Sequence, residues 1–267
     1  LARPQFGSKL KEVTRTGIEM MLAVDVSNSM LAQDFEPSRL ERTKFAIDRL
    51  TQQLEQDRIG LIVFAGDAYM QLPITSDYVA ARSFAAQISP TMVSKQGTAI
   101  GAAIDLAANS FSSGSEGSRV IVVISDGENH EDDALAAAKA AAEKGIRIYT
   151  IGIGTPEGAP ISIDGEFIKD EQGDMVVSKL DEQMLEQIAL TTGGAYIRAT
   201  NRSLGLDEIV QKINEVEKKE LTSTVFEDFN EQYQYLIGLA LALLLLEFAM
   251  LERRSRLLAR FNIFRKR

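Results

Sequence analysis

The sequence predicts an α/β fold, a doubly wound and mostly parallel sheet, followed by a C-terminal transmembrane helix. Three observations support this prediction. Strand and helix patterns alternate along the chain, several apolar runs end in polar residues as buried strands of an open sheet do, and a long apolar run near the C-terminus is followed by arginines. The 267 residues are 45% hydrophobic and 25% charged, which suits one large domain with an appendage.

The predicted elements begin with the run Met20–Val24, which is apolar at every position and therefore suits a strand buried on both faces. Ser38 and Glu41 form a capping pattern, and an apolar helical period then predicts a helix to about Glu55. The remaining predictions are strands at 58–64, 68–72 (closed by Pro73), 119–124, 147–151 and 195–199, and helices at 78–88, 99–111, 132–144, 181–191 and 206–219.

One strand is expected to run against the others. Only three residues, among them Gly66 and Asp67, separate the strands at 58–64 and 68–72, which is too short for a crossover helix, so the second should pair antiparallel at an edge of the sheet. Residues 155–180 interrupt the alternation with short β-prone pieces between glycine-containing turns. They predict a small β insertion within a domain of residues 18–219.

Residues 235–251 are apolar except for Glu247, and a helix of these 17 residues is about 26 Å long, close to the thickness of a bilayer core. Tyr233 stands at one end and arginines follow the other, so the positive-inside rule puts the C-terminus in the cytoplasm. We predict a tether at 220–232, a transmembrane helix at 233–252 and a cytoplasmic tail at 253–267. Residues 1–17 are predicted to be an N-terminal juxtamembrane segment, truncated or processed because the chain begins with Leu1.

The charge of the chain is unevenly distributed. Its formal net charge is −9, and residues 252–267 hold seven Arg and Lys against Glu252, a local +6 that leaves −15 for the remainder. Such an acidic body would repel a phosphate backbone, so the sequence predicts no nucleic-acid partner. There is no cysteine, which excludes disulfides, thiolate metal sites and a cysteine nucleophile.

Five oxygen-bearing side chains follow predicted strands or precede a helix. Asp25, Ser27 and Ser29 come directly after the first strand, Thr98 precedes the helix at 99–111, and Asp126 follows the strand at 119–124. In an open α/β sheet the carboxyl ends of the strands face the crevice where ligands bind, so these residues can meet at one edge. Hard oxygen ligands suit Mg²⁺ better than zinc or copper.

This set resembles the metal-ion-dependent adhesion site, or MIDAS, of von Willebrand factor A domains, whose pattern is Asp-x-Ser-x-Ser, then a distant Thr and a distant Asp. The resemblance implies that Ser27, Ser29 and, in the ligand-bound form, Thr98 contact the metal directly, whereas Asp25 and Asp126 act largely through waters. It implies Mg²⁺, with Mn²⁺ and Ca²⁺ as alternatives. It also implies a protein partner whose Asp or Glu carboxylate completes the coordination.

Smaller segments resemble the membrane-bound BatA/BatB proteins of bacterial aerotolerance operons. They are the leading residues 1–5, the segment 64–69, the segment 152–158, the segment 177–180 and the single C-terminal anchor. This resemblance implies a bacterial inner (cytoplasmic) membrane location with the main domain extracytoplasmic or periplasmic. It further implies assembly with sister Bat-type membrane proteins and a MoxR-type AAA ATPase on the cytoplasmic side.

Two classes of function are compared. The first is a membrane-anchored, metal-dependent protein-interaction module without enzymatic activity, and the second is a metal-dependent phosphohydrolase with Asp25 as nucleophile. Phosphotransferases of the second kind need a carboxylate two residues further on, where this chain has Ser27. The only histidine, His130, lies in an acidic polar stretch, and a Gly-x-Ser-x-Gly elbow is absent from the sequence, which disfavours serine hydrolysis. The first class is the prediction.

Overall fold

The structure is a computed structural model. It describes residues 5–8, 17–54, 56–112, 118–128, 132–163, 165–201, 203–225, 229–231 and 233–252. The chain divides into two compact units. One comprises residues 14–217, and the other combines residues 1–13 with residues 218–267.

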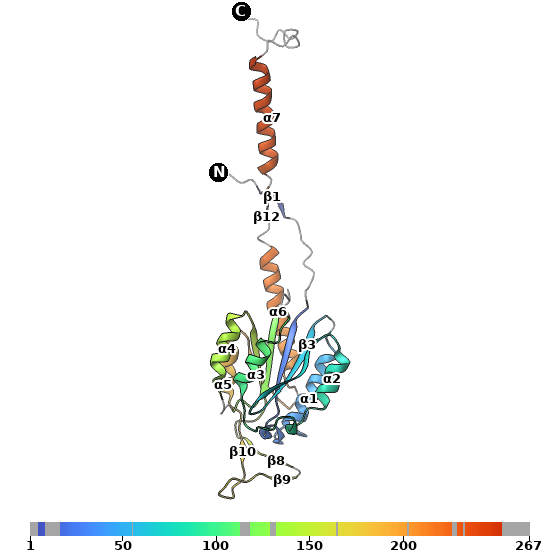
Figure 1. The fold of residues 1–267 in the computed structure, drawn as a ribbon, viewed down its shortest axis with the longest axis vertical. Helices are drawn as coiled ribbons and strands as arrows, with labels where there is room; N and C mark the ends of the chain where they lie inside the picture. The colour runs from blue at the N-terminus through green and yellow to red at the C-terminus, as the bar shows by residue number, and fades with distance from the viewer. Residues whose placement is uncertain are drawn as a thin grey trace, which may run out of the picture. The chain divides into compact units, whose positions relative to one another are not determined.

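The larger unit is built on a six-stranded sheet with the strand order β11-β6-β5-β2-β3-β4 (Figure 1). Five strands are parallel: β2 (Glu19–Asp25), β3 (Arg58–Phe64), β5 (Arg119–Ser125), β6 (Arg147–Gly152) and β11 (Tyr196–Arg198). Strand β4 (Ala68–Thr75) lies at the edge and is antiparallel to β3. The predicted mostly parallel sheet with one antiparallel edge strand is confirmed.

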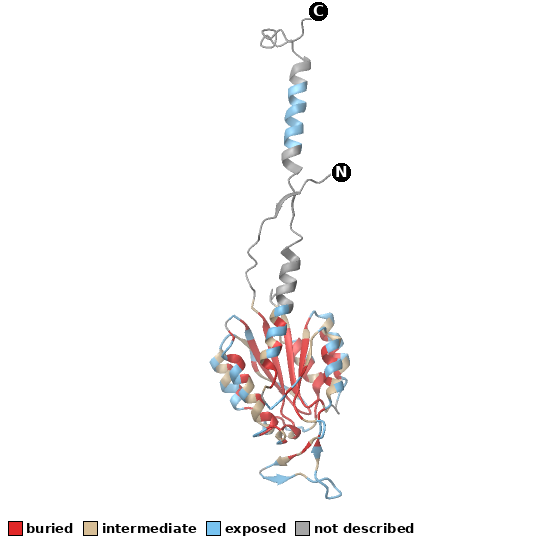
Figure 2. Cartoon of the chain, turned by 180° about the vertical axis from the view of Figure 1, so that it is seen from behind, coloured by how far each residue is buried: buried red, intermediate tan, exposed pale blue. Residues whose placement is uncertain are grey.

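Helices cover both faces of this sheet. On one face lie α1 (Arg39–Thr51), α2 (Tyr78–Ala86) and α6 (Leu206–Val225), and on the other lie α3 (Ile100–Ala108), α4 (Ala134–Glu143) and α5 (Glu182–Thr191). Successive side chains of β2 alternate between the two cores: Met20, Leu22 and Val24 pack on the first face, and Met21 and Ala23 on the second. The central strands are therefore buried on both sides, as Figure 2 shows.

Several element boundaries differ from the prediction. Helix α1 begins where expected, with the Ser38 hydroxyl accepting from Glu41 N at 3.2 Å, but it ends at Thr51 rather than near Glu55 in a tight turn closed by two i to i−3 hydrogen bonds. Strand β4 continues through Pro73 to Thr75, because an edge strand with an irregular register tolerates a residue without an N–H. Helix α6 extends six residues beyond the predicted end at 219.

The segment 155–180 forms two small antiparallel pairs. Strand β7 (Ala159–Pro160) pairs with β10 (Val177–Ser178), and β8 (Ser162–Ile163) pairs with β9 (Glu166–Phe167). An isolated bridge joins Lys169 to Met175. We call this segment the β arm; Figure 1 shows its strands projecting from the sheet edge at which β2 ends.

The smaller unit contains β1 (Gln5–Ser8) paired antiparallel with β12 (Phe229–Glu231), and the helix α7 (Tyr233–Glu252). Within the described part of the chain, no helix combines the length and apolarity needed to cross a bilayer. The transmembrane helix at 233–252 therefore stays a prediction. The basic tail at 253–267 and most of the juxtamembrane segment at 1–17 lie outside the described residues.

Candidate metal site

All five predicted ligands lie at or near the carboxyl edge of the sheet. Asp25 is the last residue of β2, Ser27 and Ser29 belong to the turn that opens the short 3-10 helix η1 (Asn28–Leu31), and Asp126 directly follows β5. Because β2 and β5 are adjacent and parallel, the two aspartates leave the sheet side by side. Both have no exposed surface, and Ser27, Ser29 and Thr98 are buried as well.

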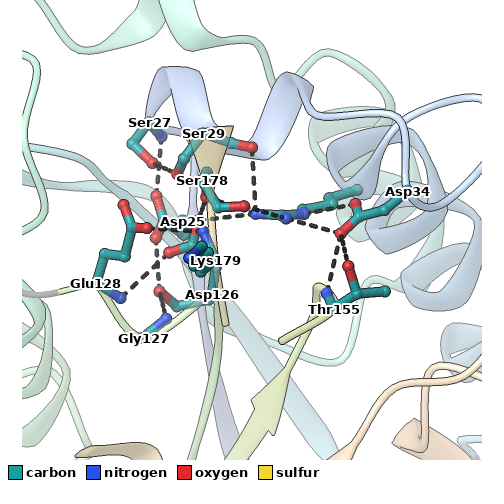
Figure 3. Close-up of polar contacts among 12 residues, drawn as sticks. Asp25, Ser27, Ser29, Asp34, Asp126, Gly127, Glu128, Thr155, Ser178 and Lys179 are labelled. Atoms are coloured by element: carbon teal, nitrogen blue, oxygen red, sulfur yellow. Dashed lines mark hydrogen bonds and ion pairs between the residues drawn. The ribbon is translucent and has the colours of Figure 1, made fainter. Parts of the chain in front are cut away.

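The Asp-x-Ser-x-Ser turn is held by its own hydrogen bonds (Figure 3). Asp25 Oδ1 accepts from Ser27 N at 2.9 Å, and its Oδ2 accepts from the hydroxyl of Ser125 at 2.6 Å. The hydroxyl oxygens of Ser27 and Ser29 are 2.8 Å apart. The carboxylate is thereby fixed in place, and the two hydroxyls converge on one point.

Thr98 reaches the same edge through its loop. Ala99 N donates to the carbonyl of Ala65 at 2.7 Å, and Asn28 N donates to Gln96 Oε1 at 3.2 Å, so the loop lies against both the end of β3 and the η1 turn. Among the described residues, none forms a hydrogen bond with the Thr98 hydroxyl. Thr98 follows Gln96 by two residues and is itself a buried residue, so the loop brings it to the edge that carries the Asp-x-Ser-x-Ser turn.

A buried arginine, which the sequence did not reveal, completes the site. Arg39 opens α1 and has no exposed side-chain surface. Its Nε and Nη2 donate to the two carboxylate oxygens of Asp34, each at 2.7 Å, and its Nη1 donates to Asp126 Oδ2 at 3.1 Å. Gly154 packs against this guanidinium: a Cβ there would lie 3.1 Å from the guanidinium carbon, and this close approach together with a φ of +144° favours glycine.

A second missed group is Ser178, at the end of β10. Its hydroxyl accepts from Arg39 Nη1 at 2.8 Å and donates to Asp126 Oδ2 at 3.0 Å. Ser125, which binds Asp25, directly precedes Asp126, so its position at the end of an apolar strand was a usable signal. For Arg39 and Ser178 the sequence offered none, because an arginine in a first helical turn is ordinarily solvated and the arm's path is set by tertiary contacts.

Asp25 and Asp34 have different electrostatic surroundings. Burial, followed by the nearby charge of Asp126, raises the pKa of Asp25 from 3.8 to about 7, although hydrogen bonds from Ser125 and Ser27 oppose the shift. Burial also acts to raise the pKa of Asp34, but the hydrogen bonds and charge of Arg39, with Thr155, hold that pKa below its ordinary value. Asp25 is therefore the carboxyl group of the site that has no cationic partner in the described structure, and its charged form is disfavoured unless a cation binds beside it.

These residues fit a hard divalent cation that is held by few charged ligands. In the described ranges, no group of three or more His, Cys, Asp and Glu side chains could hold a metal ion. The predicted set is of another kind, since it contains two carboxylates and three hydroxyls. Hydroxyl and carboxylate oxygens suit Mg²⁺, Mn²⁺ or Ca²⁺, and the charge at Asp25 would be offset by such an ion. His130 lies outside the described residues.

Comparison with known proteins agrees with this architecture. Residues 19–212 match the von Willebrand factor type A domain. The chain belongs to this family. It is 52% identical to an aerotolerance-related membrane protein from Bacteroides fragilis, whose crystal structure matches 74% of this chain and all of that chain with a TM-score of 0.72. The hypothetical protein BatB from Bacteroides thetaiotaomicron is 50% identical, with a TM-score of 0.73 over 76% of this chain and all of that chain.

More distant relatives share less of the sequence. A protein of Borreliella burgdorferi is 29% identical over 93% of this chain and 73% of its own length. Proximal thread matrix protein 1 from the mussel byssus, in a structure with a zinc-occupied MIDAS motif, is 15% identical, matches 76% of this chain and 46% of that chain, and has a TM-score of 0.56. At this low identity the mussel protein shows the shared fold alone.

The raised pKa of Asp25 predicts how the stability of the metal-free von Willebrand A domain changes with pH. A carboxyl group whose folded pKa exceeds its unfolded value stabilises the fold at low pH, and this contribution is lost as pH rises through the folded pKa of about 7. In chelator, the free energy of unfolding should fall by about 3 kcal/mol between roughly pH 5 and pH 8.5 on account of Asp25. Urea unfolding at both pH values measures this decrease in the free energy of unfolding.

Asp25→Asn supplies the control, because it removes the titrating group and keeps the shape of the side chain. The decrease should be smaller in this variant, and Mg²⁺ should stabilise the wild-type domain most at the higher pH. An identical pH dependence in wild type and Asp25→Asn would show that Asp25 does not titrate in this range.

Loss of the buried arginine should be strongly destabilising. Arg39→Ala leaves Asp34 and Asp126 buried without a counter-ion, which should cost about 3–5 kcal/mol in urea unfolding. Arg39→Lys keeps the charge but cannot span both oxygens of Asp34, so its cost should be intermediate.

Arg49 is the matched control, since it lies on the same helix, its side chain is 70% exposed, and it pairs with Asp207 at 3.3 Å. Arg49→Ala should cost at most about 1 kcal/mol. Equal costs for Arg39→Ala and Arg49→Ala would contradict a structural role for the buried cation.

Proposed function

We propose that this protein is a membrane-anchored, divalent-metal-dependent protein-interaction module without enzymatic activity. The observation that carries the proposal is the division of charge at the site. Arg39 donates to Asp126 at 3.1 Å as well as to Asp34, whereas Asp25 has no cationic partner among the described residues, and Ser27, Ser29 and Thr98 are neutral hydroxyls. When bound there, a divalent ion supplies an open coordination position for a carboxylate of the partner.

The chain's own residues prepare this position. Ser27 and Ser29 present two hydroxyl oxygens, and Asp25 is fixed by Ser125 and the backbone of Ser27. Because Asp126 is already paired with Arg39, few negative charges reach the metal directly, so the ion keeps positive charge for an acidic ligand.

The alternative, a phosphohydrolase with Asp25 as nucleophile, has weaker support. A nucleophilic carboxylate needs an oxygen free to attack, and both oxygens of Asp25 already accept hydrogen bonds in a fully buried position. The residue two positions later, where such enzymes carry an acid or base, is Ser27. The arrangement supports binding rather than turnover.

The membrane and partner parts of the proposal rest on sequence and on relatives. Residues 235–251 form the apolar run, and between Ile237 and Leu246 seven large apolar side chains of α7 are each more than half exposed. The Bacteroides fragilis relative is named as an aerotolerance-related membrane protein. We propose a subunit of an inner-membrane complex with sister Bat-type proteins and a MoxR-type ATPase, linked to oxygen or stress tolerance, with the main domain outside the cytoplasm.

Metal binding separates the two functions. The von Willebrand A domain should bind Mg²⁺, and Ser27→Ala should weaken the affinity by about tenfold or more, because it removes a direct ligand. Ser83→Ala, at an exposed serine on α2, should leave the affinity unchanged. Isothermal titration calorimetry measures the binding, and p-nitrophenyl phosphate tests for turnover. Hydrolysis that depends on Asp25 would overturn the proposal in favour of the enzyme, and equal binding by Ser27→Ala would place the metal elsewhere.

The absence of cysteine makes the topology directly testable. A membrane-impermeant maleimide should label Val79→Cys, an exposed position on α2, in intact spheroplasts, because the domain faces outward. It should label Ser255→Cys, in the basic tail, only after lysis. The reverse pattern would put the domain in the cytoplasm. So would a result in which neither cysteine is labelled before lysis.

A further inference from the structure

We infer that the β arm is a second contact surface for the partner bound at the metal site, and that it receives an apolar, basic part of that partner. This inference rests on the proposed function. The arm, residues 155–180, pairs its own short strands, so its backbone hydrogen bonds are largely made internally. Four of its large apolar side chains nevertheless remain exposed: Ile163 at 38%, Phe167 at 52%, Met175 at 56% and Val177 at 45%.

All four side chains belong to the arm, and two of them, Ile163 and Phe167, line the same depression. An open depression of about 460 Å³ is lined by Ile163, Glu166, Phe167 and Ile168. The other exposed large apolar residues described in the larger unit, such as Phe45, Val79 and Leu190, are distributed over different helices. Scattered apolar residues are ordinary on a surface, but a cluster on a projecting element is typical of a protein-interaction site.

Both ends of the arm are bound to the groups that hold the metal site (Figure 3). At its start, Thr155 donates to Asp34 Oδ2 from its backbone N at 2.9 Å and from its hydroxyl at 3.2 Å. At its end, Ser178 contacts Arg39 and Asp126, and Lys179 N donates to Glu128 Oε1 at 2.9 Å. Because Arg39 joins Asp34 to Asp126, it clamps both ends at once.

Because of these contacts of Arg39, the arm and the metal site form one continuous surface. A shift at the ends of the arm would break buried, charge-assisted hydrogen bonds to Asp126, so both ends are held beside the metal ligands. A partner that places a carboxylate on the metal therefore lies close to the arm and can contact its exposed apolar side chains.

The charge of the arm identifies the chemistry of the occupant. Residues 155–180 contain six Asp and Glu against two Lys. A second copy of this chain would bring another acidic body with about −15 outside its tail, and an anionic membrane surface would be repelled as well. The complementary partner is a protein surface with one carboxylate for the metal and, beside it, apolar and basic side chains for the arm.

Photo-cross-linking from single cysteines tests this in the full, otherwise cysteine-free chain in its native membranes. A benzophenone maleimide is attached at Phe167→Cys in the arm, at Ser94→Cys in the exposed loop that leads to Thr98, and at Val79→Cys on α2 as the matched control. Irradiation is carried out with Mg²⁺ or with chelator, and each variant is also combined with Ser27→Ala. The cross-linked protein and peptide are identified by mass spectrometry.

We expect Phe167→Cys and Ser94→Cys to capture the same protein in Mg²⁺, through a basic, apolar peptide in the case of the arm, and Val79→Cys not to capture it. Both captures should disappear with chelator or Ser27→Ala. For the purified partner, Phe167→Ser should weaken binding about tenfold, as for a central interface residue, and Val79→Ser should not.

The other outcomes separate this inference from the proposed function. Metal-dependent capture from Ser94→Cys without capture from Phe167→Cys would overturn the role of the arm and leave the proposed function intact. Capture from the arm that persists in chelator would mean two separate sites. A second copy of this chain, or lipid, as the cross-linked species would make the assigned occupant wrong. The lack of metal-dependent capture from both positions would overturn the proposed function and this inference together.

Discussion

The buried guanidinium of Arg39 connects the parts of this domain that meet at the metal edge. A cation without exposed surface is tolerated only when its donors are paired, and here they reach Asp34, Asp126 and Ser178. These groups come from the nearby loop after η1 and from the ends of β5 and β10, so one side chain joins a neighbouring loop to two segments far away along the chain. The start of α1, which carries Arg39, is in turn fixed by the Ser38 cap.

This interaction also decides the electrostatics of the site. By pairing with Asp126, Arg39 leaves Asp25 as the one predicted ligand whose charge has no cationic partner in the described structure, and burial then raises its pKa to about 7. A metal ion would replace the missing positive charge. Since the remaining ligands are neutral hydroxyls, that ion would retain an affinity for external carboxylates, which is the property of a docking site. The same arginine also holds the two ends of the β arm. It therefore affects both the charge of the metal site and the position of the arm beside it.

The geometry of the sheet explains why the strands give rigidity and the strand ends carry the polar site residues. Strand β2 is buried on both faces and paired on both sides, so it supplies rigidity but offers no surface. Polar groups can reach a ligand only where the strands end, and the predicted metal ligands lie at strand ends and in the loops that follow or approach them. The β arm extends that edge outward. The exposed apolar side chains of this projection are few, and acidic residues lie among them in the sequence.

The sequence by itself determined the sheet, its antiparallel edge strand, the two layers of helices and four of the groups around the predicted metal centre that follow β2 and β5. Periodicity and the burial of apolar runs are local properties, and the ends of adjacent parallel strands meet at one edge. Tertiary structure alone decided the role of Arg39, because its partners Asp34, Asp126 and Ser178 are 5, 87 and 139 residues away along the chain. It also decided that β4 passes through Pro73, since only the position of that strand at the edge leaves the missing N–H without cost. Contacts between residues so far apart in the sequence, such as Arg39 with Asp126 and Ser178, form only when the chain has folded. The arrangement of buried charges at this site depends on these contacts.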